Sequence, residues 1–239
     1  MRVLALDTTT RAGSAALVAD DCVVDERSGD GTRTHALRLP GELLALAEAN
    51  RWPLPTIDLY AVASGPGSFT GLRIGIATIQ GLALVHGRRV AAIPVLDALA
   101  HSVAGGLPAG ALIGALMDAH RGDVFAALYR VVTPATSHLA ELSAIEGPTV
   151  GRAAATLARW QALTTLPSVF VGDGAMASAA EIAGSSPDAR VLPAPLLGGI
   201  LGRLATARAA TAADPAAARP LYVRRPDVEI LRDEKLRRE

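Results

Sequence analysis

The segment ASGPGSFTGLRIG, residues 63–75, has the composition of a loop that could bind an anion. It follows the apolar run LYAVA and precedes a long apolar segment, which together predict a strand, a glycine-rich turn and a helix. Gly65 and Gly67 permit backbone angles that other residues avoid, and Pro66 keeps Gly65 out of the helical region. Because the first N–H groups of a helix attract anions, this loop could hold a phosphate.

The spacing of the glycines, however, completes neither common phosphate motif. The loop of the nucleotide hydrolases needs Gly-Lys-Ser/Thr, whereas this helix begins TGLRIG, and Gly65, Gly67 and Gly71 are spaced G-x-G-x-x-x-G instead of G-x-G-x-x-G. The alternative is a tight turn before a buried helix over residues 70–86, with Thr70 as its N-cap. Both interpretations stay open at this point.

Other reactive residue types do not form a recognisable catalytic or metal motif. Ser68 has no G-x-S-x-G elbow around it, which argues against a peptidase. The five histidines are at least 15 residues apart, so no close-spaced pair of metal ligands exists. Cys22 is the only cysteine, and we predict an inert core thiol in a reducing, cytoplasmic setting. We therefore expect no catalytic residue and no metal ligand on this chain.

The elements that must position the loop follow from the pattern of apolar runs. RVLALDTT, SAALVAD and CVVDERSG predict three consecutive strands, and THALRLPGELLALAEAN predicts a helix. The strand DLYAVASG, the helix over residues 70–86, the strand RVAAIPV and the helix LDALAHSVAG come next. The order of this first part is βββαβαβα.

A similar order begins again after GGLPAG. The segments LALDTTTRAGSAALV and GALMDAHRGDVFAAL both give an apolar strand, an aspartate (Asp7 and Asp118), a polar turn and a second strand. SHLAELSAIEG, TVGRAAATLARWQAL, SVFVGDGA and LLGGILGRLATARAA complete the second set as strand, helix, strand and helix. This plan is that of the α/β actin-like, sugar-kinase-like fold, with two βββαβα-type subdomains facing a cleft. We expect subdomains at residues 1–104 and 105–222 and a charged C-terminal tail at 223–239.

That fold implies a set of residues for residual nucleotide contact. In its active members, hairpin hydroxyls and amides cradle phosphates while aspartates orient magnesium or water. The corresponding residues here are Asp7, Thr8, Thr9, Asp118, Gly172 and Gly174. Alternatively, Asp7 and Asp118 only cap their turns.

The helix over residues 70–86 has more apolar surface than one sheet can cover. Gly71 and Gly75, like Ala77 and Gly81, are four residues apart, and such rows of small residues let another helix approach closely. The approaching helix could be residues 34–50 of the same chain or could belong to a partner protein.

Charge and hydropathy limit the remaining functional classes. Lys+Arg and Asp+Glu number 23 each, so the chain has no basic surplus with which to bind nucleic acid strongly by itself. Apolar residues make up 50%, yet no run is long enough to predict a signal peptide or a membrane span. A folded protein without membrane segments is expected.

At this point the motifs resemble a known family. SGPGSFTGLRIG looks like the signature of the TsaB (YeaZ) family, the bacterial paralogue of TsaD, and LALDTTT…SAAL, HALRLP, MDAHRGDVFAALY and PLYVR match its pattern in order. The resemblance implies an actin-like fold and a non-catalytic subunit of the complex that transfers threonylcarbamoyl from threonylcarbamoyl-adenylate to an anticodon-loop adenosine in tRNA. TsaD and TsaE are the implied partners, with tRNA bound indirectly, and ATP and metal are expected on those partner subunits rather than on this chain.

The resemblance also implies which helices bind TsaD, namely residues 34–50 and 70–86. The predicted partner-binding residues are Leu39, Leu43, Leu46, Phe69, Gly71, Ile74, Gly75, Thr78 and Leu82. Two other hypotheses remain: an actin-fold phosphotransferase or ATPase acting alone through Asp7 and Asp118, and a homodimer formed when the partner is absent.

Overall fold

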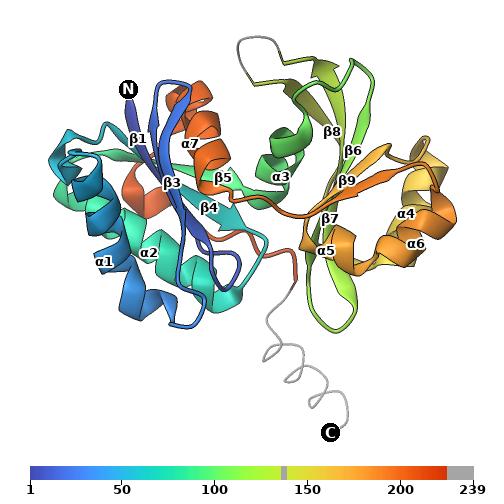
Figure 1. The fold of residues 1–239 in the computed structure, drawn as a ribbon, viewed down its shortest axis with the longest axis horizontal. Helices are drawn as coiled ribbons and strands as arrows, with labels where there is room; N and C mark the ends of the chain where they lie inside the picture. The colour runs from blue at the N-terminus through green and yellow to red at the C-terminus, as the bar shows by residue number, and fades with distance from the viewer. Residues whose placement is uncertain (136–138, 225–239) are drawn as a thin grey trace, which may run out of the picture.

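Two five-stranded mixed sheets form the framework of the computed structural model, which describes residues 1–135 and 139–224 (Figure 1). The first sheet has the order β3-β2-β1-β4-β5, and the second has the order β10-β9-β6-β7-β8. The strands of the first sheet are β1 (Arg2–Asp7), β2 (Ser14–Ala19), β3 (Cys22–Ser28), β4 (Leu59–Gly65) and β5 (Arg89–Pro94). Those of the second sheet are β6 (Leu112–Asp118), β7 (Asp123–Thr133), β8 (Glu141–Arg152), β9 (Val169–Val171) and β10 (Arg190–Leu192). When the second order is written in reverse, from β8 to β10, it matches the first order with β6 in the place of β1. This match confirms the predicted duplication.

Along each strand, successive side chains alternate between the two faces of the sheet, and this alternation divides the core into layers. In β1, Leu4 and Leu6 face the helices α1 (His35–Ala49) and α2 (Phe69–Val85), whereas Val3 and Ala5 face the middle of the molecule. Successive side chains of a strand point to opposite faces, so both faces of this sheet must be covered. The helices α4 (Ala153–Leu163), α5 (Asp173–Ala177) and α6 (Ala179–Ser185) cover the outer face of the second sheet in the same way.

Between the sheets lie α3 (Val95–Val103) and α7 (Gly198–Ala207), as Figure 1 shows. α3 contacts strands of both sheets, and one continuous apolar core joins the two halves there. α7, although it follows the second sheet in sequence, packs on β1, β2 and β3 of the first. The expected boundary near residue 104 therefore separates the sheets but does not separate the helices that cover them.

The attachment of α7 rests on hydrogen bonds from its first turn to the first sheet. The Oγ atom of Ser14 accepts the N–H groups of Leu197 at 3.1 Å and Gly198 at 2.9 Å. The carboxylate of Glu26 accepts the N–H of Gly199 at 2.8 Å. These bonds satisfy donors that a helix N-terminus otherwise leaves without partners.

The chain then returns across the first half as a strap, defined here as residues 209–224, which contains the short 3₁₀ turns η2 (Ala209–Thr211) and η3 (Pro215–Ala217). Ala213 and Val90 exchange two backbone hydrogen bonds of 3.0 Å at the edge of β5. Leu221 donates its N–H to the carbonyl of Ser64, at the end of β4, at 2.7 Å. The strap thus brings the chain back to the loop that follows β4.

Several sequence predictions need correction. The segment between β9 and α7 contains α5, α6 and β10, which the apolar pattern did not separate. β8 runs on to Arg152, so α4 begins at Ala153, later than predicted. Cys22 is exposed because β3 is an edge strand, and it is not a core thiol. The predicted charged tail lies outside the described residues beyond position 224. Among the described helices, none is long and apolar enough to cross a membrane.

Candidate functional site

The glycine-rich loop forms the sharp turn that its sequence predicts. Gly65 and Gly67 have φ values of 114° and 156°, in the region that favours glycine. The N-cap of α2, however, is Ser68 and not Thr70: the Oγ atom of Ser68 accepts the N–H of Gly71 at 3.2 Å, and Thr70 lies exposed in the first turn. The N-cap therefore lies two residues earlier than predicted, and the helix begins at Phe69.

Gly67 of the loop and Gly71 of α2 pack against the β1–β2 hairpin of the same chain. A Cβ atom on Gly67 would lie 2.6 Å from the side chain of Thr9, and one on Gly71 would lie 2.1 Å from the carbonyl oxygen of Thr8. The hydroxyl of Thr8 donates to the carbonyl of Gly71 at 2.8 Å. The surface that these glycines open is filled by the hairpin, which supports the turn interpretation over the phosphate interpretation.

Both predicted cleft aspartates cap their own turns. One oxygen of Asp7 accepts the N–H of Thr9 at 2.8 Å and its hydroxyl at 2.6 Å, and one oxygen of Asp118 accepts the N–H of His120 at 2.8 Å. Burial raises the pKa of the Asp7 carboxyl above its ordinary value, although the bonds from Thr9 oppose the rise and Asp173 adds to it. Contact of these residues with a nucleotide stays a prediction.

The glycines of the GDG segment have an equivalent packing role in the second half. A Cβ atom on Gly172 would lie 1.9 Å from the carbonyl oxygen of Leu116, and one on Gly174 would lie 2.5 Å from the carbonyl carbon of Met117. Between them, Asp173 accepts the N–H groups of Asp118 at 3.0 Å and of Gly174 at 2.8 Å. Each half thus anchors its post-strand glycines on its own first hairpin.

A cleft of about 820 Å³ opens between the two hairpins. Thr9 and Asp118 line this cleft, whereas Asp7 lines a smaller hollow of about 210 Å³ beside it. The other predicted residues, Thr8, Gly172 and Gly174, line neither. The cleft walls come from residues 9–11, 32–35 and 66–72 of the first half, residues 117–121 of the second, and residues 221–224 of the strap.

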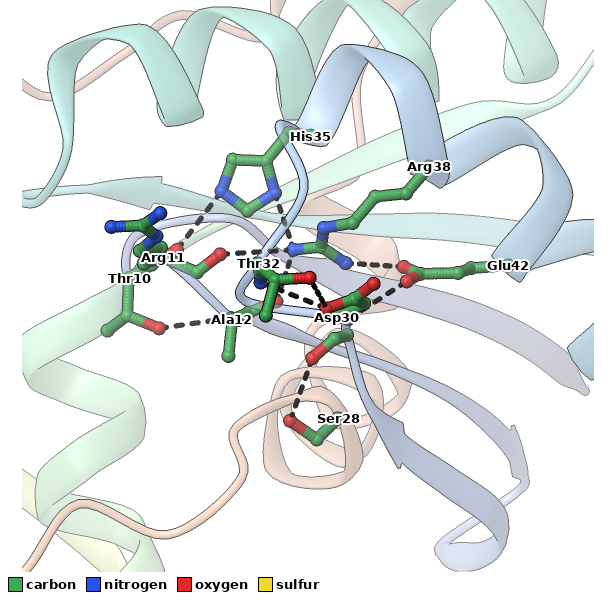
Figure 2. Close-up of polar contacts among 11 residues, drawn as sticks. Thr10, Arg11, Ala12, Ser28, Asp30, Thr32, His35, Arg38 and Glu42 are labelled. Carbon is green, nitrogen blue, oxygen red and sulfur yellow. Dashed lines mark hydrogen bonds and ion pairs between the residues drawn. The ribbon is translucent and has the colours of Figure 1, made fainter.

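A buried arginine, which sequence reasoning missed, fixes the start of α1 (Figure 2). The guanidinium of Arg38 donates to the carbonyl of Ala12, to the carboxylate of Glu42 and, at 2.8 Å, to Nδ1 of His35. Nε2 of His35 lies 3.1 Å from the carbonyl of Thr10, so the ring is neutral with its proton on Nε2. Burial lowers the pKa of His35, and the neighbouring Arg38 lowers it further. The only signal in the sequence is a charged residue within the apolar stripe of the helix.

The helix face predicted for partner binding needs revision residue by residue. Leu39, Leu43 and Leu46 are at most 2% exposed, because they form the core between α1 and the first sheet. Gly71 and Gly75 are buried against the hairpin. None of these five residues is available to a partner, whereas the others of the predicted set are half-buried: Phe69, Ile74, Thr78 and Leu82.

The large apolar side chains that α1 and α2 leave exposed are not among the residues predicted to bind a partner. On α1, Leu37 and Leu44 are 69% and 47% exposed, and on α2, Leu84 and Val85 are 74% and 80% exposed. Gly41, Ala77 and Gly81 are also exposed, and Cβ atoms on Gly41 and Gly81 would meet nothing within 4 Å. α1 and α2 contact each other on the outer side of the first sheet (Figure 1). These seven residues are called the helix face below.

Comparisons with known proteins agree with this architecture. The family model TsaD, described as tRNA N6-adenosine threonylcarbamoyltransferase, matches residues 30–192. An uncharacterized protein of Mycobacterium tuberculosis is 34% identical over 236 residues, which cover 96% of this chain and 94% of that protein. The tRNA threonylcarbamoyladenosine biosynthesis protein TsaB of Escherichia coli is 34% identical over 150 residues, 63% of this chain and 64% of that protein.

Solved structures extend the likeness over nearly the whole chain. YeaZ from Pseudomonas aeruginosa has a TM-score of 0.65 at 25% identity, covering 92% of this chain and 99% of that one. A second Pseudomonas aeruginosa structure, of an uncharacterized protein with similarity to peptidase YEAZ, has a TM-score of 0.72 at 25% identity and covers 93% and 99%. The chain belongs to the TsaB (YeaZ) family. The predicted actin-like α/β fold is thereby confirmed.

The TsaB motifs lie on specific elements of the structure. The signature SGPGSFTGLRIG forms the end of β4, the turn and the first two turns of α2, and HALRLP forms the start of α1 with Arg38 inside it. PLYVR lies in the strap, against the signature loop. Within residues 1–135 and 139–224, no group of three His, Cys, Asp or Glu side chains gathers that could hold a metal ion.

Proposed function

We propose that this chain is a non-catalytic subunit in the biosynthesis of threonylcarbamoyladenosine in tRNA and that it binds a TsaD protein through the helix face. It activates TsaD for transfer of threonylcarbamoyl from threonylcarbamoyl-adenylate to an anticodon-loop adenosine. TsaE and tRNA join through the resulting complex, in which ATP and metal are held by the other subunits. The proposal rests chiefly on one observation, the uncovered apolar face of two adjacent helices in a TsaB family member.

The composition of the helix face suits a protein partner. Leu37, Leu44 and Leu84 are large apolar side chains left in solvent on neighbouring helices. Large exposed apolar surfaces are typical of interaction sites. Gly41 and Gly81 provide open positions where another backbone can approach closely. Truncating large anchors of this kind is what usually weakens an interface most.

The relation between this chain and the TsaD family supports that family as the partner. The TsaD model matches residues 30–192, which include both helices of the face. Homologous subunits that present the same helix pair can associate about a two-fold axis, as the subunits of symmetric dimers do. A heterodimer with TsaD is therefore the assembly we propose, and a homodimer through the same face is its competitor.

The state of the hairpin hydroxyls supports a role without chemistry of its own. The hydroxyl of Thr8 is bonded to Gly71, and that of Thr9 is bonded to Asp7, so both donors are already used inside the chain. An ATPase acting through these residues would need to break both bonds first. We accordingly expect no ATP turnover by the isolated chain.

The test is size-exclusion chromatography with light scattering on this chain, the TsaD protein of the same organism, and their mixture. Leu84→Asp places a charge on the proposed face, near the C-terminal end of α2, and Leu163→Asp, at an exposed leucine on α4 in the other half, is the matched control. Ile74 and Gly75 are poorer choices, because Ile74 packs against the core and Gly75 packs against Thr8.

We expect wild type and Leu163→Asp to form a heterodimer and Leu84→Asp to remain separate. If Leu84→Asp binds TsaD as well as wild type does, the helix face is not the binding surface. If wild type doubles its mass alone and never binds TsaD, the homodimer replaces the proposal.

A further inference from the structure

Arg73 stands out on the proposed interface because α2 carries no other ionisable side chain. The sequence of the helix is FTGLRIGIATIQGLALV, and the other residues are apolar, small or uncharged polar. Arg73 is exposed, and positions 73, 77, 81 and 84 follow the four- and three-residue spacing of one helix side. The guanidinium therefore lies at the N-terminal end of the same side of α2 that carries Ala77, Gly81 and Leu84.

The strap holds this guanidinium in a defined position. The Cζ atom of Arg73 lies 3.9 Å from the centroid of the Phe69 ring, and the Nε of Arg73 donates to the hydroxyl of Tyr222 at 3.0 Å. The rings of Phe69 and Tyr222 stack at 4.7 Å with an interplanar angle of 27°. A cation over an aromatic face is attracted to it, so these contacts restrict an otherwise mobile side chain.

The outward half of the guanidinium has no such partner. Within the described part of the chain, Nη1 and Nη2 of Arg73 form no hydrogen bond, and Arg73 forms no salt bridge. A guanidinium presents its N–H groups as a planar fork that matches a carboxylate with two parallel hydrogen bonds. Because Phe69 and Tyr222 already order the side chain, binding a carboxylate would cost little additional side-chain entropy.

We propose that Arg73 binds the carboxylate of an aspartate or glutamate on the protein that docks on the helix face. This inference rests on the proposed function and names one polar contact in it. The neighbouring Ala77, Gly81 and Leu84 favour a protein carboxylate over an RNA phosphate, because RNA binding relies on several cations along the backbone. The contact would fix the register of the partner along α2, while the apolar residues exclude water.

The experiment is titration calorimetry of the full chain with TsaD at low salt, using Arg73→Ala, Arg73→Lys and Tyr222→Phe. Arg190→Ala, an exposed arginine at the start of β10, is the matched control. We expect Arg73→Ala to weaken binding at least about tenfold and Arg73→Lys not to restore it, because an ammonium lacks the fork. Tyr222→Phe removes only the hydroxyl that holds Nε and should weaken binding several-fold, with a circular dichroism spectrum like that of wild type.

The outcomes separate this inference from the proposed function. If Arg73→Ala and Tyr222→Phe bind like Arg190→Ala while Leu84→Asp does not bind, the carboxylate contact is wrong and the helix face stands. If Leu84→Asp also binds normally, the proposed function is wrong as well. If Arg73→Ala keeps its affinity for TsaD but lowers binding of tRNA to the complex, the ligand of Arg73 is a phosphate, which overturns the inference.

Discussion

Gly75 of α2 lies directly against Thr8 of the β1–β2 hairpin, where a Cβ atom would come within 2.1 Å of the threonine Oγ1. The helix that carries the proposed partner surface is therefore held from behind by the first hairpin of the chain. Its position depends on the absence of a side chain at residue 75.

Substitution of that glycine tests the contact. We expect Gly75→Ala to lower the free energy of unfolding by about 1–3 kcal/mol, because the added methyl group overpacks a site closed by backbone and Thr8. Gly81→Ala is the control on the same helix, where nothing lies within 4 Å, and it should be neutral or stabilising by up to about 1 kcal/mol. Urea unfolding measures both, and equal effects of the two changes would contradict the packing argument.

The link between α3 and α7 predicts a dependence of stability on acid. The carboxylate of Asp97 on α3 lies 3.3 Å from Nδ1 of His101 and forms an ion pair with Arg208 at the end of α7. Although burial opposes ionisation of Asp97, the hydrogen bonds from His101 and Arg208 are together stronger and lower its pKa. A lowered carboxyl pKa contributes stability above the unfolded value of about 3.9, and this stability is lost as the pH falls toward the folded value.

Asp97→Asn should therefore cost about 1–2 kcal/mol near neutral pH, discounted for the partial exposure of Arg208. The variant should also show a flatter loss of stability below about pH 4 than wild type. Thermal unfolding across that pH range measures the difference. Parallel curves for the two proteins would show that Asp97 has no depressed pKa.

The lowered pKa of His35 predicts a second pH range, separate from that of Asp97, in which the stability of the fold changes. Its folded pKa is lowered by burial and by Arg38, so the unfolded chain takes up the proton first as the pH falls below about 6.5. Stability should therefore decrease between that pH and the folded pKa. His35→Gln, whose amide can donate to Thr10 and accept from Arg38, should be less sensitive in this window, whereas His120→Gln, at a mostly exposed histidine, should behave like wild type. Hydrogen exchange in the first turn of α1 would locate the effect, and its absence there would count against the prediction.

Substitution of Ser14 tests how much its two hydrogen bonds contribute to the attachment of α7 to the first sheet. Ser14→Ala would leave the N–H groups of Leu197 and Gly198 without their common acceptor in a buried place, at a cost of about 1–3 kcal/mol. Ser28→Ala, at an exposed serine on β3, should change stability by less than about 0.5 kcal/mol. Chemical unfolding gives both values, and a neutral Ser14→Ala would mean that water replaces the hydroxyl.

The sequence predicted the fold well because its signals are local and repeated. The two aspartates at strand ends and the glycines after β4 and β9 recur in both halves, and strand periodicity supplied the order. The N-cap was misplaced by two residues because Ser68 and Thr70 are both good caps, and only the backbone path decides between them.

Surface assignments were less accurate because periodicity does not say which of two stripes is covered. On α1, Leu39 and Leu43 belong to the buried stripe, whereas Leu37, two positions before Leu39, and Leu44, one position after Leu43, are exposed. Glycine spacing has the same limit: the row at Gly71 and Gly75 faces a hairpin instead of a helix. Contacts such as Ser14 with Gly198 join residues far apart in sequence, and no local pattern announces them.

The return of α7 to the first sheet has a consequence for the order of events during synthesis. Val3, Ala5 and Val18 on the inner face of that sheet belong to the core that α7 completes, yet α7 ends at Ala207. A nascent chain that has produced the first five strands and α3 still exposes this apolar face until α7 has left the ribosome. Ribosome-bound chains that stop before residue 198 should therefore be recognised by chaperones, whereas chains extended past residue 207 should escape them.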